Sequence, residues 1–199
     1  MKIVTIKGKR YGWNYKRTIV VTCITIALAA GAFAFAGQEP ADQVKVYEPE
    51  DSIVVQDLFP VPVIADVPLD AGLQEFIWNV SEDYGLDPKL VIAVIGQESN
   101  YQSDAVSEDG QCVGLMQVQK NCHEDRMDRL DAEDLFDPYD NVVVGIDYLS
   151  ECIERGGLEW GLMCYNGGPD YADAKTASGI KTEYVEGVLY LYESMGGTR

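Results

Sequence analysis

Glu98 is the residue whose surroundings best suit a carboxylate used in chemistry. It ends an apolar stretch that begins at Pro88, and Val91, Val94 and Ile95 lie seven, four and three positions before it. On a helix these spacings put Glu98 on the face that should be buried. Because burial disfavours the charged form of a carboxyl group, we expect Glu98 to hold its proton near neutral pH. It could then act as a general acid unless a cation pairs with it.

The elements that must position Glu98 are predicted to be mainly helical from residue 70 onward. Helices are predicted at residues 70–84, 88–98, 140–155, 158–165 and 182–195. Asp87 can cap the second of these and Pro88 suits its first position, while Gly85 can end the helix before it. Residues 104–118 have the composition of a loop and a small hairpin. The predicted fold class is therefore mainly α with a small β-hairpin.

The N-terminal part of the chain predicts export. Residues 1–17 contain six Lys or Arg and no acid, and residues 18–36 carry no charge. This pattern places the N-terminus in the cytoplasm and the remaining chain across the membrane. The apolar run of 19 residues is close to the length of a membrane span, whereas Ala-Phe-Ala at residues 34–36 offers a cleavage site. A signal peptide and a membrane anchor both remain open, and both place the domain outside the cytoplasm, at the membrane's outer face, in the cell wall or secreted.

A tether is predicted at residues 37–69, between the leader and a domain at residues 70–199. It contains five of the chain's eight prolines, which stiffen a backbone and suit a spacer. Beyond the leader, nine Lys or Arg remain against 33 acids, which is a formal charge of −24. Such a charge would repel phosphate and argues against nucleic acid as a partner.

Cysteines are the other reactive side chains of the sequence, and they occur at Cys23, Cys112, Cys122, Cys152 and Cys164. The first lies in the apolar export segment, and the even number left outside the cytoplasm predicts disulfides. Of three possible pairings, the order along the chain favours Cys112 with Cys122 and Cys152 with Cys164. A zinc site is disfavoured because His123 is the only histidine and no Cys-x-x-Cys spacing occurs. A cysteine nucleophile is disfavoured because Cys164 has no local histidine.

Five short motifs follow one another from Glu98 onward. They are Glu98-Ser99-Asn100-Tyr101, Gly114-Leu115-Met116-Gln117-Val118, Asn141 with Gly145 and Tyr148-Leu149, Tyr165-Asn166-Gly167-Gly168, and Tyr184-Val185. Each motif alone is weak, but together, in this order and spacing, they resemble the soluble lytic transglycosylase domain. The resemblance spans about residues 73–195.

The resemblance implies a lysozyme-like helical fold with a groove for peptidoglycan glycan strands and no cofactor. Glu98 matches the family's sole catalytic acid. It would protonate the oxygen between N-acetylmuramic acid and N-acetylglucosamine, and then act as base on the muramic acid's own primary hydroxyl. The product would be a 1,6-anhydromuramoyl end, with no water consumed. This chemistry can use one carboxylate, whereas ordinary glycosidases use two that lie roughly 5–9.5 Å apart.

The resemblance also implies roles for residues around the acid. Gln117 would hydrogen-bond sugar, and Met116 would lie at the sugar, with core packing as its alternative. Tyr165 and Asn166 match a substrate-binding segment, although Asn166 also suits a helix end. Tyr184 matches a tyrosine whose hydroxyl points at the catalytic carboxyl.

Three further residues are expected to support the site. Ser99 is expected to bond backbone near the groove, because no histidine base lies near it in the sequence to make it a nucleophile. Gly114 belongs to the motif that lines the groove, and Asn141 opens the next motif.

Two alternatives to the lytic activity stay open at this point. A muramidase would hydrolyse the same bond with water, using Asp104, Glu108 or Asp109 as a second carboxylate. A wall-binding or assembly module would have no turnover. The acidic residues of the stretch 121–140 predict a solvated charged surface in preference to a calcium site, because their spacing does not follow the EF-hand order.

Overall fold

The computed structural model describes residues 4–6, 9–11 and 61–198, and the chain divides into two compact units, Met1–Pro60 and Val61–Arg199. In the first unit, β1 (Val4–Ile6) pairs antiparallel with β2 (Lys9–Tyr11). The predicted export segment lies outside the described residues, as does the tether up to residue 60. Within the described parts of the chain, no helix combines the length and the apolar character that a membrane span needs.

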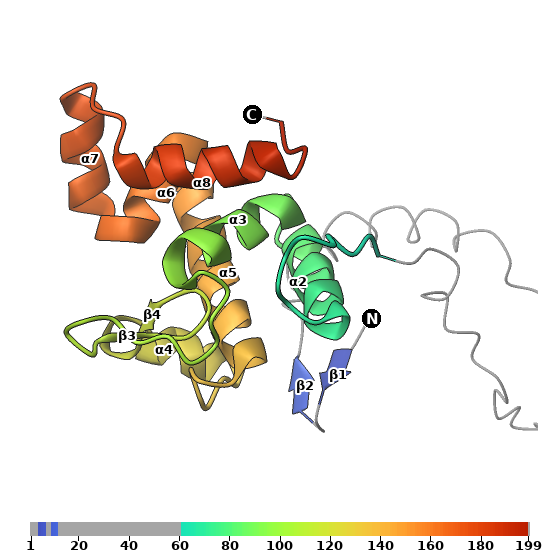
Figure 1. Cartoon of the computed structure of the whole chain (residues 1–199). Helices are drawn as coiled ribbons and strands as arrows, with labels where there is room; N and C mark the ends of the chain where they lie inside the picture. The colour runs from blue at the N-terminus through green and yellow to red at the C-terminus, as the bar shows by residue number, and fades with distance from the viewer. Residues whose placement is uncertain (1–3, 7–8, 12–60, 199) are drawn as a thin grey trace, which may run out of the picture. The chain divides into compact units, whose positions relative to one another are not determined.

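The second unit is a mainly helical domain with one small hairpin, as the sequence predicts. Its elements are α2 (Ala71–Asp83), α3 (Pro88–Ser99), β3 (Cys112–Val113), β4 (Val118–Gln119), α4 (Lys120–Leu130), α5 (Pro138–Gly156), α6 (Leu158–Gly167), α7 (Pro169–Ala177) and α8 (Glu183–Ser194). Figure 1 shows α4 and the β3–β4 hairpin at one end of the domain and α6, α7 and α8 at the other. The long helix α5 runs between these two ends.

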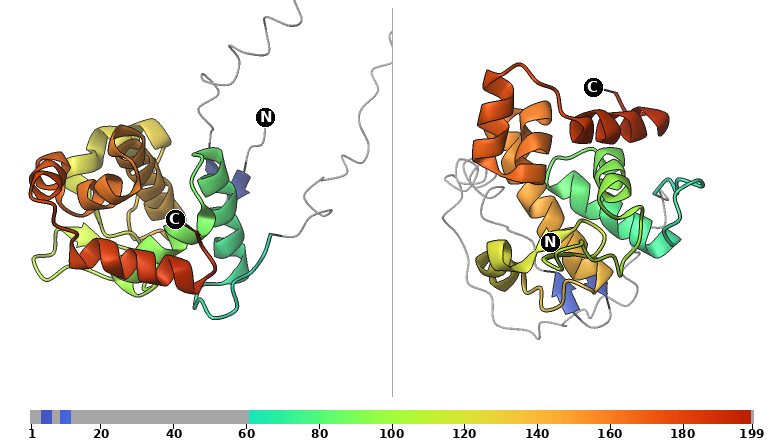
Figure 2. Two further views of the ribbon diagram at one scale, coloured as in Figure 1. Left: turned by 90° about the horizontal axis from the view of Figure 1, so that it is seen from above. Right: turned by 60° about the vertical axis from the view of Figure 1, so that its left-hand side comes forward.

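The core of the domain is built on α3. Its residues 91–95 are fully buried, and the helix packs against α2 on one side and α8 on the other. The two views in Figure 2 show α8 lying along α3. Burying one large aliphatic side chain contributes roughly 1.5–3 kcal/mol, so this run fixes α3 firmly. Glu98, at the end of the same helix, is held by that packing.

Side-chain caps begin four of the domain's helices, and three of these, α2, α3 and α8, have the starts that the sequence predicts. Asp70 accepts from the backbone N–H of Leu73 at the start of α2, and Asp87 accepts from that of Lys89 at the start of α3. Thr182 caps α8 in the same way. The predicted starts of these helices are therefore confirmed, because each cap satisfies a backbone donor that the first turn leaves free.

Two helices, α4 and α7, were not predicted. Their patterns are weak because each buries only one residue, Met127 in α4 and Ala172 in α7. The third difference is that α5 begins at Pro138, two residues before its predicted start, with Asp137 as its cap. Two acids of the stretch 121–140 therefore stabilise nearby backbone. Asp137 caps α5, and Asp140 accepts from the backbone N–H groups of residues 133 and 134.

The last part of the predicted tether packs on the domain. Gln74 of α2 is 2% exposed, and its side chain bonds the backbone of residues 64, 67 and 69. A buried amide needs partners for its donors and its acceptor, and these backbone groups supply them. The compact unit that contains the domain begins at Val61, nine residues before the predicted boundary.

Candidate active site

Glu98 lies one residue before the end of α3, facing α8. The phenolic hydroxyl of Tyr184, in the first turn of α8, donates to Glu98 Oε1 at 2.6 Å. Burial raises the pKa of Glu98 from its ordinary 4.5 to about 7, and the hydrogen bond from Tyr184 lowers it in part. A carboxyl group with such a pKa can give a proton at neutral pH and take one back, as a general acid and base must.

Among the contacts of the described residues, the side chain of Glu98 bonds Tyr184 and no carboxylate. Burial is the main cause of its raised pKa, and the Tyr184 bond opposes it. Asp109 is exposed and accepts from the hydroxyl of Ser107 and the backbone N–H of Gln111, which hold its pKa below the ordinary value. Asp104 and Glu108 are also exposed. The three carboxylates considered as partners of Glu98 therefore face solvent on their own loop.

Asn141 fixes the loop that follows β3. It is fully buried in α5, where its Oδ1 accepts from the backbone N–H of Met116 at 2.8 Å. Its Nδ2 donates to the carbonyls of Val113 and Leu135, both at 2.8 Å. Gly114 has a φ of 77°, and a Cβ there would lie 2.2 Å from Asn141 Nδ2. Only glycine fits this backbone and this close approach.

Met116 does not offer its side chain as the resemblance implies, and Gln117 can do so only in part. Met116 is fully buried and packs where a Cβ on Gly145 would meet its sulfur, so its role is corrected from sugar contact to core packing. Gln117 has a φ of 47°, and its Nε2 donates to the carbonyls of Ala105 and Gly114. Its amide nitrogen therefore braces the loop, which leaves the carbonyl oxygen as the atom it can offer to a ligand.

The rings of Tyr165, Tyr148 and His123 lie next to one another, and Tyr165 bonds the loop that follows β3. Tyr165 of α6 donates to the carbonyl of Met116 at 2.8 Å. Its ring centroid lies 5.4 Å from that of Tyr148, which lies 4.6 Å from that of His123. His123, considered above only as a zinc ligand, stands at a non-helical kink inside α4.

The other expected site residues fall near Glu98 or at helix ends. Ser99 is buried and donates to the carbonyl of Ile95, as expected of a structural residue. Asn166 is exposed near the end of α6. Within the described residues, no group of three His, Cys, Asp or Glu side chains is placed to hold a metal ion.

The four domain cysteines are free thiols in the structure, so neither expected disulfide is formed in it. Cys152 and Cys164 are each 2% exposed. Burial and the adjacent Cys164 thiol raise the pKa of Cys152. Burial likewise raises the pKa of Cys112, to which the charges of Asp109, Glu98 and Cys122 add. Each thiol of an expected pair therefore lies within electrostatic reach of its partner.

Comparison with known proteins gives three matches. The model of the Transglycosylase SLT domain family matches residues 75–184. A transglycosylase of Enterobacteria phage PRD1 is 34% identical over 107 residues, which are 52% of this chain and 38% of the phage protein. An inactive mutant of the lytic transglycosylase Slt from Pseudomonas aeruginosa matches with a TM-score of 0.54 and 22% identity, over 62% of this chain and 24% of that one. The chain thus spans well under half of the length of each of these two relatives. The structural match confirms the predicted lysozyme-like fold.

Proposed function

The chain belongs to the transglycosylase SLT domain family, and from that membership we propose that it is a peptidoglycan lytic transglycosylase. It cleaves the β-1,4 bond between N-acetylmuramic acid and N-acetylglucosamine and leaves a 1,6-anhydromuramoyl end. The observation that carries the proposal is the half-buried carboxyl group of Glu98, with a pKa of about 7 and one hydroxyl donor on it.

The arrangement suits one group that serves in both halves of the reaction. Protonated Glu98 gives its proton to the glycosidic oxygen as the bond breaks. The resulting carboxylate then accepts the proton of the muramic acid's primary hydroxyl, which attacks the anomeric carbon. Tyr184 donates to Glu98 Oε1 and stabilises the carboxylate between the two proton transfers.

The lack of a partner carboxylate argues against hydrolysis. A hydrolase of this bond would use a second acid, either to activate water or to attack the sugar. Among the described residues, Glu98 bonds the hydroxyl of Tyr184 and no carboxylate, and Asp104, Glu108 and Asp109 are exposed. We therefore favour internal attack by the sugar's own hydroxyl.

Substrate contacts are proposed for three residues around the acid. Asn166 is exposed and can offer its amide to a glycan. Tyr165 and Gln117 are partly buried and hold the loop that forms one wall beside Glu98. Their contribution to binding is through the loop's shape and the Gln117 carbonyl.

The test is product analysis. Purified peptidoglycan is digested with the full chain, and the soluble muropeptides are weighed by mass spectrometry. Anhydromuramoyl ends, each one water lighter than a reducing end, are expected. Reducing ends as the main product would instead establish a hydrolase, and no release of glycan would favour a binding module.

Export of the domain at residues 70–199 by the leader is part of the proposal, because peptidoglycan lies outside the cytoplasm. The charge pattern of residues 1–36 supports it. The N-terminus of the protein recovered from cells decides between the two forms of the leader. A chain starting at Gly37 indicates a cleaved signal peptide, and an intact N-terminus in the membrane fraction indicates an anchor.

Disulfides Cys112–Cys122 and Cys152–Cys164 are proposed for the exported protein. Each forms when two thiols give two electrons and two protons to the disulfide of an exported thiol oxidant. Because Cys152 and Cys164 are each 2% exposed, that pair must oxidise before folding is complete. Alkylation of the unfolded, unreduced protein followed by mass analysis should find no modified domain cysteine. Four modified cysteines would rule the disulfides out.

A further inference from the structure

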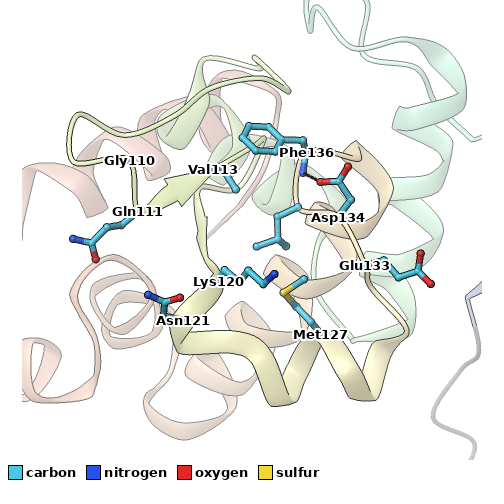
Figure 3. Close-up of a pocket in the computed structure, with 10 residues that line it drawn as sticks. Gly110, Gln111, Val113, Lys120, Asn121, Met127, Glu133, Asp134 and Phe136 are labelled. Atoms are coloured by element: carbon cyan, nitrogen blue, oxygen red, sulfur yellow. Dashed lines mark hydrogen bonds between the residues drawn. The ribbon is translucent and has the colours of Figure 1, made fainter.

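A cavity of about 350 Å³ lies beside the hairpin, apart from Glu98. It is open to solvent and bordered by the hairpin, by α4 and by the loop before α5. Its lining residues are Gly110, Gln111, Val113, Lys120, Asn121, Met127, Glu133, Asp134, Leu135 and Phe136. Figure 3 shows the side chains of Lys120 and Met127 directed into it and that of Glu133 directed away. Its volume falls in the range of roughly 300–1,000 Å³ that small ligands occupy.

Lys120 is a cation without a partner at this end of the domain. The nearby cations of α4, Arg126 and Arg129, both pair with Asp147 of α5. Among the contacts of the described residues, by contrast, Lys120 makes neither an ion pair nor a side-chain hydrogen bond. The exported part of the chain has a formal charge of −24, so a free cation over a cavity is where an anionic ligand group can be accepted.

The remaining lining calls for a ligand that also has apolar and cationic parts. Met127 and Leu135 are each 5% exposed and give the cavity an apolar base. Asp134 uses one carboxylate oxygen to accept from the backbone N–H of Phe136, which leaves its other oxygen open. The matching ligand is a short peptide with a carboxylate, an ammonium group and small aliphatic side chains.

The wall of this cavity is continuous with the loop beside Glu98. Val113 lines the cavity, and its carbonyl is held by Asn141, which also holds Met116. The next residue, Gly114, opens the loop that the resemblance places along the glycan. A peptide branching from a glycan beside Glu98 could reach across this hairpin, since three to five extended residues span at most roughly 10–18 Å.

We propose that this cavity binds the peptide stem of peptidoglycan, with Lys120 donating to a stem carboxylate and Asp134 accepting from the ammonium group of its diamino acid. This inference rests on the proposed function, because it takes the glycan strand as the occupant of the neighbouring groove. Binding there adds recognition of the peptide to recognition of the sugar.

The first test compares two substrates with the full chain. Intact peptidoglycan and the same material stripped of stems by an amidase are digested by the wild type, by Lys120→Met and by Lys89→Met. Lys89, at the far end of α3 from Glu98, donates to the Gly196 carbonyl and is the matched control. For Lys120→Met, the ratio of rates on intact and stripped wall should fall roughly tenfold, the loss of one charge-assisted contact. An unchanged ratio would overturn the inference.

The second test separates this inference from the proposed function. The stem tetrapeptide L-Ala-γ-D-Glu-diaminopimelate-D-Ala is added to the full chain, and amide NMR signals are followed. Saturable shifts at Val113, Lys120 and Asp134 that weaken in Lys120→Met and persist in Lys89→Met support the site, even if no wall material is cleaved. The absence of shifts would refute the site even if anhydro ends are formed.

Discussion

A single glutamate carries the proposed chemistry, and its environment makes its protonation unusual. Its pKa lies near 7 because burial outweighs the stabilising hydrogen bond from Tyr184. The sequence alone pointed to this burial through the apolar positions before Glu98 on α3. It could not show how far the pKa of Glu98 is lowered again by a hydrogen bond, because the donor, Tyr184, lies 86 residues away in the sequence.

Replacing Glu98 by Gln should abolish turnover without weakening the fold. The loss in rate is expected to be roughly 10²- to 10⁴-fold, as for removal of a general acid. The folded-state pKa of about 7 exceeds the ordinary 4.5, so ionisation of Glu98 costs stability as pH rises through that window. Above pH 7 the Gln variant should match or exceed the wild type in stability, by up to ~3 kcal/mol. Urea unfolding across pH measures this, and retained turnover would remove Glu98 from its role.

Replacing Tyr184 by Phe should shift the pH profile. The hydrogen bond from Tyr184 lowers the pKa of Glu98, so its removal raises that pKa further. The basic limb of the rate profile should then move to higher pH, with a rate loss of roughly tenfold at the optimum. Tyr190→Phe, on the same helix and 72% exposed, is the control. A basic limb that stays in place would mean that Tyr184 does not act on the acid.

At the scale of elements, helix ends and buried amides hold the site together. Asn141 of α5 bonds Val113 in β3, Met116 in the loop after it and Leu135 in the segment before α5. Gln74 joins α2 to residues 64, 67 and 69 in a similar way. Both side-chain amides are buried, so replacing either one by alanine leaves backbone groups without hydrogen-bond partners.

Asn141→Ala should destabilise the domain by roughly 2–4 kcal/mol, because the backbone N–H of Met116 and two carbonyls lose their partner in a buried place. Denaturant unfolding gives the value, and glycan cleavage should fall with it as the loop loosens. Asn79→Ala, at a partly exposed position on α2, serves as control. A loss under ~1 kcal/mol for Asn141→Ala would contradict the structural role given to it.

Gln74→Ala should release the segment at residues 61–69 from α2. The expected signs are faster hydrogen exchange at the Ile64 amide, which donates to Gln74 Oε1 at 2.8 Å, and a stability loss of roughly 1–3 kcal/mol. Glu75→Ala, at the exposed neighbouring position, should change neither the exchange at the Ile64 amide nor the stability. Exchange at Ile64 that does not change would show that the segment is held by other contacts.

The sequence predicted helices where caps and apolar spacing agree, as in α2, α3 and α8. It missed α4 and α7 because each buries a single residue, so their formation depends on neighbours and not on a periodic pattern. It placed Glu98 and Tyr184 together only through a family resemblance. The burial of Met116 and the loop-bracing bonds of Gln117 depend on the backbone around Gly114, which no local pattern encodes.

The molecule as a whole is strongly acidic, and its proposed substrate is a neutral glycan that carries charged peptides. The proposed acid, Glu98, lies near the end of α3, and the proposed peptide site lies beside the hairpin. Sugar chemistry and peptide recognition would then be carried by different parts of one domain. The central claim is that Glu98 works without a second carboxylate and without water.

Digestion of peptidoglycan in water enriched in heavy oxygen tests that claim most directly. If the muramic acid's own hydroxyl closes the ring, the new ends should carry no heavy oxygen in the mass spectrum of the wild-type products. Glu98→Gln should give no new ends of either kind. Heavy oxygen at the anomeric carbon of most new ends would contradict the account, because it would show that water completes the reaction.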